Sequence, residues 1–329
     1  MWASFFRRIF LKVSVKLYKI LHYSYSLYCI FILVIEVIDD VTKILPIEIK
    51  NIVLTLENRE NITEIRLRVG KKLRVYFGKQ EKVFNKIVFK QDILSVLSNI
   101  SLNSIYSVQN DINKGFVTIE GGNRVGIAGE VVIIDGRIKN IKEISSMNIR
   151  VAKEFIGIAD KIMNQIYDGE NIKNTVIVSP PGCGKTTVLR DIIRNLSVDG
   201  YNVSVIDERG EIAAMYGGLP SLDIGDRTDV ISFVDKAEGM QMAVRSLAPH
   251  VVCTDEIGSL EDVEAIKYVC KSGVAFITTL HGKCIEDVMQ SALKEIISQG
   301  NLDNIIILSG IGNIEKVYTN LNVMEEIKC

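Results

Sequence analysis

The sequence has little net charge, no paired cysteine motif and no internal repeat. Its 39 basic and 40 acidic residues give a formal net charge of −1, so the chain as a whole offers no broad electrostatic attraction to nucleic acid. The 6 cysteines include no Cys-x-x-Cys pair and no histidine spacing suited to zinc. Low-complexity linkers are also absent. What remains is a chain of 329 residues with 47% hydrophobic residues, the composition of an ordinary folded protein of two domains.

A glycine-rich turn follows an apolar run in the second half of the chain. Residues 175–178 read Thr-Val-Ile-Val, residues 179–187 read Ser-Pro-Pro-Gly-Cys-Gly-Lys-Thr-Thr, and a helical pattern comes next. A β-branched run, such a turn and then Lys-Thr predict a P-loop. The first glycine of the usual pattern is Ser179 here, which tolerates a turn while Gly182 and Gly184 remain. The sequence therefore predicts a nucleotide-binding site.

The residues of this turn have distinct expected roles. Backbone N–H groups must point inward around the phosphates, which a Cβ atom would obstruct. Lys185 would reach the β- and γ-phosphates, and the Thr186 hydroxyl would bind Mg²⁺. The expected ligands are ATP and Mg²⁺, and the expected nucleotide-binding residues are Pro181, Gly182, Cys183, Gly184, Lys185, Thr186 and Thr187.

A second apolar strand, at residues 250–254, ends in two carboxylates, Asp255 and Glu256. In P-loop proteins this is the form of a Walker B strand. Asp255 would bind Mg²⁺ together with Thr186, and Glu256 would orient the attacking water. The alternative is that the two acids only cap the strand and bind nothing.

Three further candidate positions, one of them a pair of acidic residues, are less specific. Asp207 and Glu208 follow the strand at 203–206, and close carboxylates repel each other unless a cation or a proton lies between them. Mg²⁺ or an ordered water could serve there, with a solvated loop as the alternative. His281 follows a strand at 274–278 and falls at the edge where α/β sites form, as a γ-phosphate contact or as a structural residue. Arg245, ten residues before Asp255, is expected near the site within the same chain.

The first 38 residues form a separate problem. A basic segment precedes an uncharged stretch at 20–35, which is shorter than the roughly 20 residues that a spanning helix prefers. As a signal anchor it would export the rest of the chain to a place without ATP. Two interpretations avoid this conflict: an amphipathic anchor on the inner membrane face, or a start codon assigned too far upstream. A true membrane span is the third.

Periodicity divides the remainder into domains at 39–150 and 151–329. In the first, we expect a strand at 62–69 paired with 73–77, a helix at 90–100, and short strands at 116–119, 124–127, 130–134 and 138–141. In the second, we expect a helix over 151–167 and buried strands at 175–178, 203–206, 251–254, 274–278 and 305–308, with an edge hairpin at 310–320. The fold class is α/β: a P-loop NTPase domain, RecA-like with a mostly parallel sheet, preceded by a small α+β domain.

Taken together, the four strand ends resemble the secretion-superfamily ATPases, the hexameric motors of type II and type IV secretion. Residues 207–209 stand where the Asp box of those proteins falls, and 279–282 looks like their His box. Further blocks resemble the stage III sporulation protein AA family over roughly residues 39 to 329, nearly the whole chain. These blocks are at 65–70, 107–109, 121–126, 144–146, 148–150 and 236–240.

The resemblance implies an ATPase at the mother-cell face of the forespore channel of endospore-forming bacteria. It implies a homo-oligomer, a hexamer, that is cytoplasmic and peripheral on the inner membrane face, and that works with inner-membrane proteins of a secretion-like complex. Charge stabilisation from outside the loop would come from an arginine. The candidates in the first domain, which could reach a neighbouring subunit, are Arg66, Arg68, Arg124 and Arg150.

Two other functions are compatible with the same residues. One is a nucleic-acid-binding, helicase-like ATPase, because a basic hairpin lies at residues 66–74; the near-zero net charge makes nucleic acid the less favoured partner. The other is an ATP-gated scaffold with little turnover.

Overall fold

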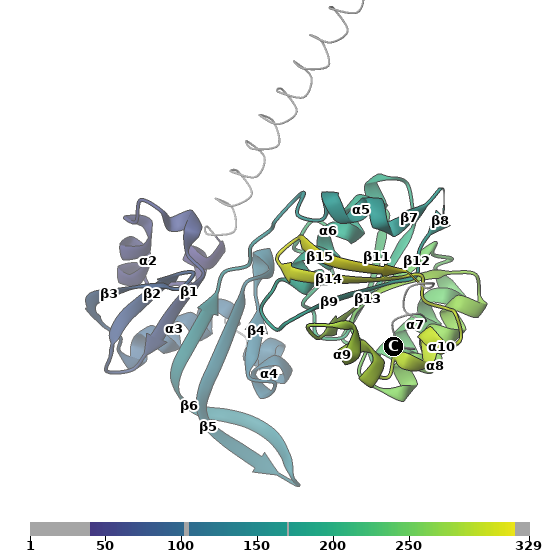
Figure 1. The fold of residues 1–329 in the computed structure, drawn as a ribbon. Helices are drawn as coiled ribbons and strands as arrows, with labels where there is room; N and C mark the ends of the chain where they lie inside the picture. Colours follow the sequence, from purple (N-terminus) through teal and green to yellow (C-terminus); the bar gives the residue numbers. More distant parts are fainter. Residues whose placement is uncertain (1–39, 102–104, 170, 320–329) are drawn as a thin grey trace, which may run out of the picture. The chain divides into compact units, whose positions relative to one another are not determined.

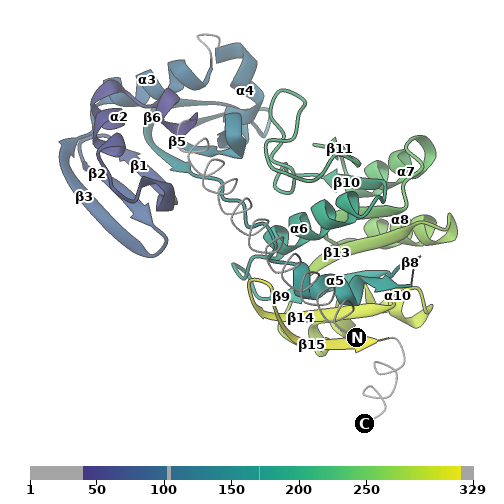
Figure 2. The same cartoon turned by 90° about the horizontal axis from the view of Figure 1, so that it is seen from above.

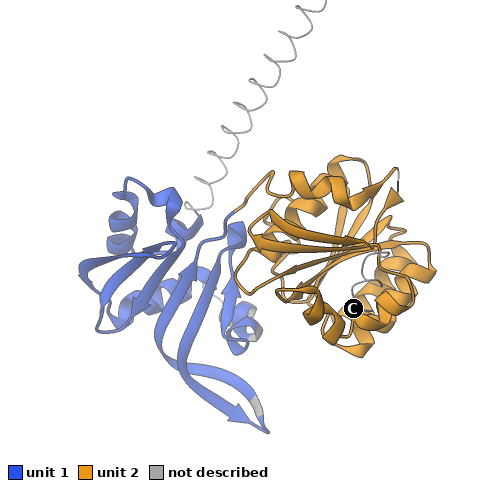
Figure 3. Cartoon of the chain, viewed as in Figure 1, with its two compact units in different colours: residues 1–153 blue, residues 154–329 orange. Residues whose placement is uncertain are grey.

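The computed structural model describes residues 40–101, 105–169 and 171–319. The chain divides into two compact units, residues 1–153 and 154–329 (Figure 3). The expected extension at residues 1–38 lies outside the described residues. Across the described ranges, no helix is both long enough and apolar enough to cross a membrane.

The first unit is built on a six-stranded antiparallel sheet in the order β3-β2-β1-β6-β5-β4 (Figure 1). Alternation along the strands places side chains such as Ile65, Leu67 and Ile149 on a fully buried face, against which the helices pack. The strands are β1 (Glu64–Arg68), β2 (Lys72–Phe77), β3 (Gln80–Ile87), β4 (Phe116–Thr118), β5 (Arg124–Ile134) and β6 (Arg137–Arg150), and the helices are α2 (Ile47–Leu54), α3 (Lys90–Ile100) and α4 (Ile105–Asn113).

The predicted hairpin of the first unit is confirmed as β1 and β2, and the predicted helix at 90–100 as α3. The four short strands were an underestimate, because the last three and the following segment merge into the long pair β5 and β6. Gly129, which lies between the predicted strands 124–127 and 130–134, is in a bulge of β5. A Cβ atom there would lie 2.7 Å from the Lys142 carbonyl oxygen, so glycine lets the strands continue past each other.

The second unit contains a seven-stranded sheet in the order β11-β10-β12-β13-β9-β14-β15. All neighbours pair in parallel except β14 and β15, which form the predicted edge hairpin. Helices α5 and α6 pack on one face of this sheet and α7 to α10 on the other, as Figure 1 shows, and Figure 2 shows the strands side by side. The strands are β9 (Thr175–Ser179), β10 (Val203–Asp207), β11 (Thr228–Ser232), β12 (Val251–Glu256), β13 (Ala275–His281), β14 (Asn304–Gly310) and β15 (Asn313–Thr319), besides the short pair β7 (Tyr167–Asp168) and β8 (Asn171–Ile172); the helices are α5 (Asp160–Ile166), α6 (Lys185–Val198), α7 (Lys236–Ser246), α8 (Leu260–Lys271), α9 (Ile285–Gln290) and α10 (Lys294–Ser298).

Two expectations for the second unit differ from the structure. The predicted helix at 151–167 is wrong for its first half, since α5 begins only at Asp160. The Val151 amide donates to the Thr63 carbonyl at 3.0 Å, and Gly157 has φ +81°, so the chain leaves the sheet and turns before the helix starts. Strand β11, at the other sheet edge, was missed because its five residues are only partly buried.

Candidate functional site

Four predicted strand ends meet at one edge of the parallel sheet. Strands β10, β12, β13 and β9 are neighbours in that order, and they end at Asp207, Glu256, His281 and Ser179. Because parallel strands have their carboxyl ends at the same edge, residues far apart in the sequence come together there.

The turn between β9 and α6 has the conformation that its glycines predict. Gly182 and Gly184 both have φ +76°, and a Cβ atom at Gly184 would lie 2.8 Å from Ile311 Cγ1. Ser179 is a residue of β9 with no such requirement, which explains why the usual first glycine is dispensable here. Gly184 is the N-cap of α6 and makes no side-chain cap, so the first amides of the helix are left for an anion.

Lys185 is the centre of a chain of polar contacts. Its side chain is buried, and Nζ donates to the Ser179 carbonyl oxygen at 2.9 Å and to His281 Nδ1 at 2.6 Å. His281 Nε2 lies 3.3 Å from Glu256 Oε2, so the imidazole accepts from the lysine with Nδ1 and faces the carboxylate with Nε2. Burial lowers the pKa of Lys185, against the charges of Glu256 and Cys183. The structure thus brings Lys185, His281 and Glu256 together.

A second polar cluster contains Asp255, Glu208 and a lysine. Lys236 Nζ lies 2.6 Å from Glu208 Oε2 and 3.4 Å from Asp255 Oδ1. Burial raises the pKa of Asp255, and the nearby Lys236 opposes this shift. Burial lowers the pKa of Lys236, but the hydrogen bond to Glu208 and the charge of Asp255 raise it overall. The protein itself therefore supplies a cation between Glu208 and Asp255.

Asp207 has a different environment from its neighbours. It is fully buried; Oδ1 accepts the Glu211 amide at 2.8 Å, and Oδ2 accepts the amides of Ile212 and Ala213 at 3.1 and 2.9 Å. Backbone donors therefore satisfy this carboxylate, and it holds the loop after β10. The structure assigns Asp207 a supporting position rather than one open to a phosphate or a water.

These contacts predict a stability effect at Asp207. Asp207→Asn should lower the free energy of unfolding by about 3 kcal/mol, because an amide nitrogen would face backbone donors in a buried site. Asp229→Asn on the neighbouring strand β11 is the matched control, since Asp229 is exposed, and it should change stability by less than about 0.5 kcal/mol. Urea unfolding of the two variants is the measurement. Equal stabilities would contradict this role of Asp207.

The other predicted residues are placed as follows. Thr186 and Thr187 lie half-buried in the first turn of α6, and Pro181 is exposed in the loop. Arg245 is in the last turn of α7, which returns from β11 to β12 and so runs opposite to the strands. At 1.5 Å per residue it lies about 14 Å along the helix from Lys236, with its guanidinium 6.0 Å from the ring centroid of Tyr268. The expectation that Arg245 lies near the site in the same chain is therefore not met.

Sequence reasoning missed Lys236 as a functional residue. The signal was present, because the segment 236–240 was one of the blocks that carried the family resemblance. No local pattern predicts that Lys236 contacts the carboxylates, since it lies 28 residues from Glu208 and a lysine at the start of a helix is ordinarily solvated. Only the packing of α7 against β10 and β12 reveals its partners.

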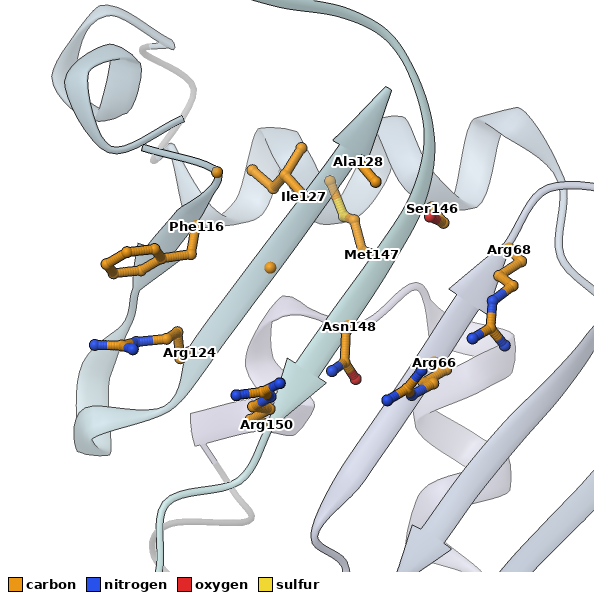
Figure 4. A pocket seen from close by; sticks show the side chains of 12 residues that line it. Arg66, Arg68, Phe116, Arg124, Ile127, Ala128, Ser146, Met147, Asn148 and Arg150 are labelled. Carbon is orange, nitrogen blue, oxygen red and sulfur yellow. The ribbon is translucent and has the colours of Figure 1, made fainter. Parts of the chain in front are cut away.

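The first unit has a polar pocket of its own, of about 370 Å³, on the sheet face opposite the buried one. Figure 4 shows four arginines on this face: Arg66 and Arg68 from β1, Arg124 from β5 and Arg150 from β6. Arg66 Nε donates to Glu64 Oε2 at 2.8 Å, and the Arg124 guanidinium stacks 4.1 Å from the Phe116 ring centroid. Four guanidinium groups in one pocket suit a carboxylate or a phosphate.

Known structures share this fold. The chain is similar to the ATPase DotB of Yersinia pseudotuberculosis (TM-score 0.58, 14% identity, 86% of this chain and 82% of that one). It is also similar to the pilus retraction motor PilT, solved with bound ADP (TM-score 0.56, 17% identity, 85% of this chain and 86% of that one). These likenesses define the class of fold: a mixed α/β domain with a mostly parallel sheet, preceded by a separate antiparallel sheet.

The chain belongs to the family of the sporulation stage III protein AA, whose pattern matches residues 36–323. It is 34% identical to stage III sporulation protein AA of Bacillus subtilis (strain 168), over 85% of this chain and 94% of that protein. An uncharacterized protein of Porphyra purpurea, ycf45, is 25% identical over 79% of this chain, which spans 43% of that protein's length.

Proposed function

We propose that the chain is a Mg²⁺-dependent ATPase that acts as the motor of a secretion-like complex during endospore formation. The observation that carries the proposal is the contact chain Lys185–His281–Glu256 beside an uncapped phosphate loop. This arrangement places a phosphate-binding cation and a candidate general base at one sheet edge. The bound ADP of the similar PilT structure supports a nucleotide as the ligand of such a fold.

The residues of the site have different proposed roles in the transfer of a phosphoryl group to water. The amides of the loop and Lys185 bind the phosphates of ATP, which compete with His281 for the ammonium of Lys185. Glu256 orients the attacking water and accepts its proton. His281 contacts both Lys185 and Glu256. Binding of a phosphate at Lys185 would therefore change the surroundings of the Glu256 carboxylate through His281. Glu208 supports the cluster through Lys236.

The residues present also fit a magnesium ion. Mg²⁺ in such sites is held by one or two protein oxygens and the substrate phosphates. Asp255 Oδ1 is buried and has no hydrogen-bond partner, and the Thr186 hydroxyl is in the first turn of α6, so these two residues would hold the ion. When bound, Mg²⁺ would neutralise charge that develops on the phosphate oxygens.

The four arginines of the first unit are the proposed source of charge stabilisation in trans. One of them would reach the ATP of a neighbouring subunit in a closed ring, for which a hexamer is the expected state. The proposed location is the cytoplasmic side of the mother-cell membrane, with inner-membrane proteins as partners. This role comes from the family membership and not from the geometry of the site.

The experiment that tests the function has two parts. Purified protein should release phosphate from ATP only with Mg²⁺, and turnover should rise when the membrane partners are added. In a spore-forming host, an allele that carries Lys185→Ala should give as few heat-resistant spores as a deletion. Nucleotide binding without measurable turnover, with or without partners, would favour the ATP-gated scaffold instead.

The structure offers little for the nucleic-acid alternative. In the basic hairpin, Arg66 bonds to Glu64 and Arg74 to Glu81 at 2.7 Å, and Lys72 donates to Asn85 Oδ1 at 3.0 Å. These groups have partners within their own sheet. Gel shifts with single-stranded DNA at two salt concentrations remain the direct test.

Alkylation of Cys183 should inactivate the ATPase, and Mg-ATP should slow the labelling. Cys183 is half-buried within the phosphate loop, and a maleimide adduct would occupy the space of a phosphate. Peptide mapping by mass spectrometry gives label incorporation at each cysteine with and without nucleotide. Cys270 and Cys284 are internal controls, because both are half-buried outside the loop. Equal labelling of Cys183 in both conditions would contradict the proposed phosphate site.

A further inference from the structure

The first residue of α7 is a buried lysine, Lys236. It is 8% exposed and follows the N-cap Asp235, whose Oδ1 accepts the Ala237 amide at 2.9 Å. A positive charge is unfavourable at a helix N-terminus, because the helix dipole is positive there. Burial adds a further cost unless the charge is paired. Lys236 therefore does not stabilise its own helix, and its position depends on the partners of its ammonium group.

The two partners of Lys236 are held differently. The contact of Nζ with Glu208 Oε2, at 2.6 Å, is a hydrogen bond. The contact with Asp255 Oδ1, at 3.4 Å, is an ion pair without a hydrogen bond, since that oxygen has no hydrogen-bond partner. Glu208 thus anchors the ammonium, and the lone pairs of the Asp255 oxygen stay available to another cation.

We propose that Lys236 is a positioning residue that limits the metal affinity of Asp255, by supplying in the nucleotide-free protein the positive charge that Mg²⁺ supplies in the loaded protein. This inference rests on the proposed function of the site. Lys236 contacts two acidic side chains at neighbouring strands, Glu208 directly after β10 and Asp255 in β12. Without an internal cation, such a cluster would retain Mg²⁺ after hydrolysis. A fixed ammonium 3.4 Å from the metal-binding oxygen repels the ion and so favours its release with the product.

The test is metal binding rather than turnover. Free Mn²⁺ is measured by electron paramagnetic resonance during titration of MnCl₂ into the full-length protein with ADP. Lys236→Met should tighten Mn²⁺ binding roughly tenfold, because it removes a like charge next to the ion. Lys236→Arg keeps the charge and should stay close to the wild type.

Lys267→Met is the matched control. Lys267 is also buried, at 7% exposure, and also bonds to two carboxylates, Glu264 and Glu295, but it lies on α8 and bonds to none of the strand-end carboxylates. The Lys267→Met variant should leave Mn²⁺ affinity unchanged. An equal effect of both lysine variants would overturn the proposal, since general destabilisation would then account for it.

Glu208→Gln should change Mn²⁺ affinity in the opposite direction. Without its anchor, the Lys236 ammonium moves to Asp255, and Mn²⁺ binding should weaken, while the double variant with Lys236→Met should return close to the wild type. Should Lys236→Met not fold, as judged by thermal unfolding, the direction of the Glu208→Gln effect decides. Unchanged or weaker binding in folded Lys236→Met, or unchanged binding in Glu208→Gln, would overturn the inference. Failure of the wild type to hydrolyse ATP, with the expected Mn²⁺ shifts present, would contradict only the proposed function.

Discussion

Lys185→Ala should abolish ATP binding, whereas Glu256→Gln should bind ATP normally and stop its hydrolysis. The two residues are linked through His281 but have different proposed targets, the phosphates and the attacking water. Loss of a buried cation that bonds to phosphate should lower ATP affinity by roughly 10²-fold or more. Loss of a general base should lower kcat by roughly 10²–10⁴-fold. Fluorescent-nucleotide binding and phosphate release measure the two effects separately.

Matched variants separate these effects from unspecific loss of charge. Lys161→Ala removes an exposed lysine from α5, and Glu261→Gln removes an exposed carboxylate from the first turn of α8. Both should bind and hydrolyse ATP like the wild type. Normal turnover of Glu256→Gln would show that Glu256 is not the base, and Glu208 would then be the next carboxylate to test.

An alanine variant of the arginine that acts in trans should lower kcat by roughly 10³-fold or more while ATP binding is retained. Arg124 and Arg150 are direct partners in the register of β5 and β6. The candidates line one pocket of the first unit: Arg66, Arg68, Arg124 and Arg150. Arg74→Ala is the control, because Arg74 lies on β2 and bonds to Glu81. A comparable loss in Arg74→Ala would indicate damage to the sheet rather than to the reaction.

Subunit mixing distinguishes action in trans from action within one chain. An inactive arginine variant and the inactive Lys185→Ala variant, mixed before assembly, should regain part of the activity. Mixed rings would contain sites with an intact loop from one subunit and an intact arginine from the next. No recovery at any mixing ratio, with mixed assembly verified by differently tagged subunits, would contradict the trans role.

The glycine turn between β9 and α6 and the buried strands could be predicted because each is encoded in contiguous residues. The turn needs glycine where φ is positive, as at Gly182 and Gly184. A strand covered on both faces needs an unbroken apolar run, as in β9. The hairpin of β1 and β2 follows in the same way from alternation and a short turn. Local errors arose at two glycines. Gly129 permits a bulge that joins two predicted strands into β5, and Gly157 interrupts a pattern that was predicted as one helix.

By itself, the sequence determined the fold class, the position of the glycine turn before α6 and the acidic strand ends, because these depend on local conformation and hydrophobic pattern. Only the tertiary structure decided which charges pair. Strand β13 lies between β12 and β9, and this brings His281 to Lys185 across 96 residues of sequence. The packing of α7 brings Lys236 to Glu208 and Asp255, and backbone amides satisfy Asp207. Such pairings depend on strand order and helix packing, which the whole core sets, and no local propensity encodes them.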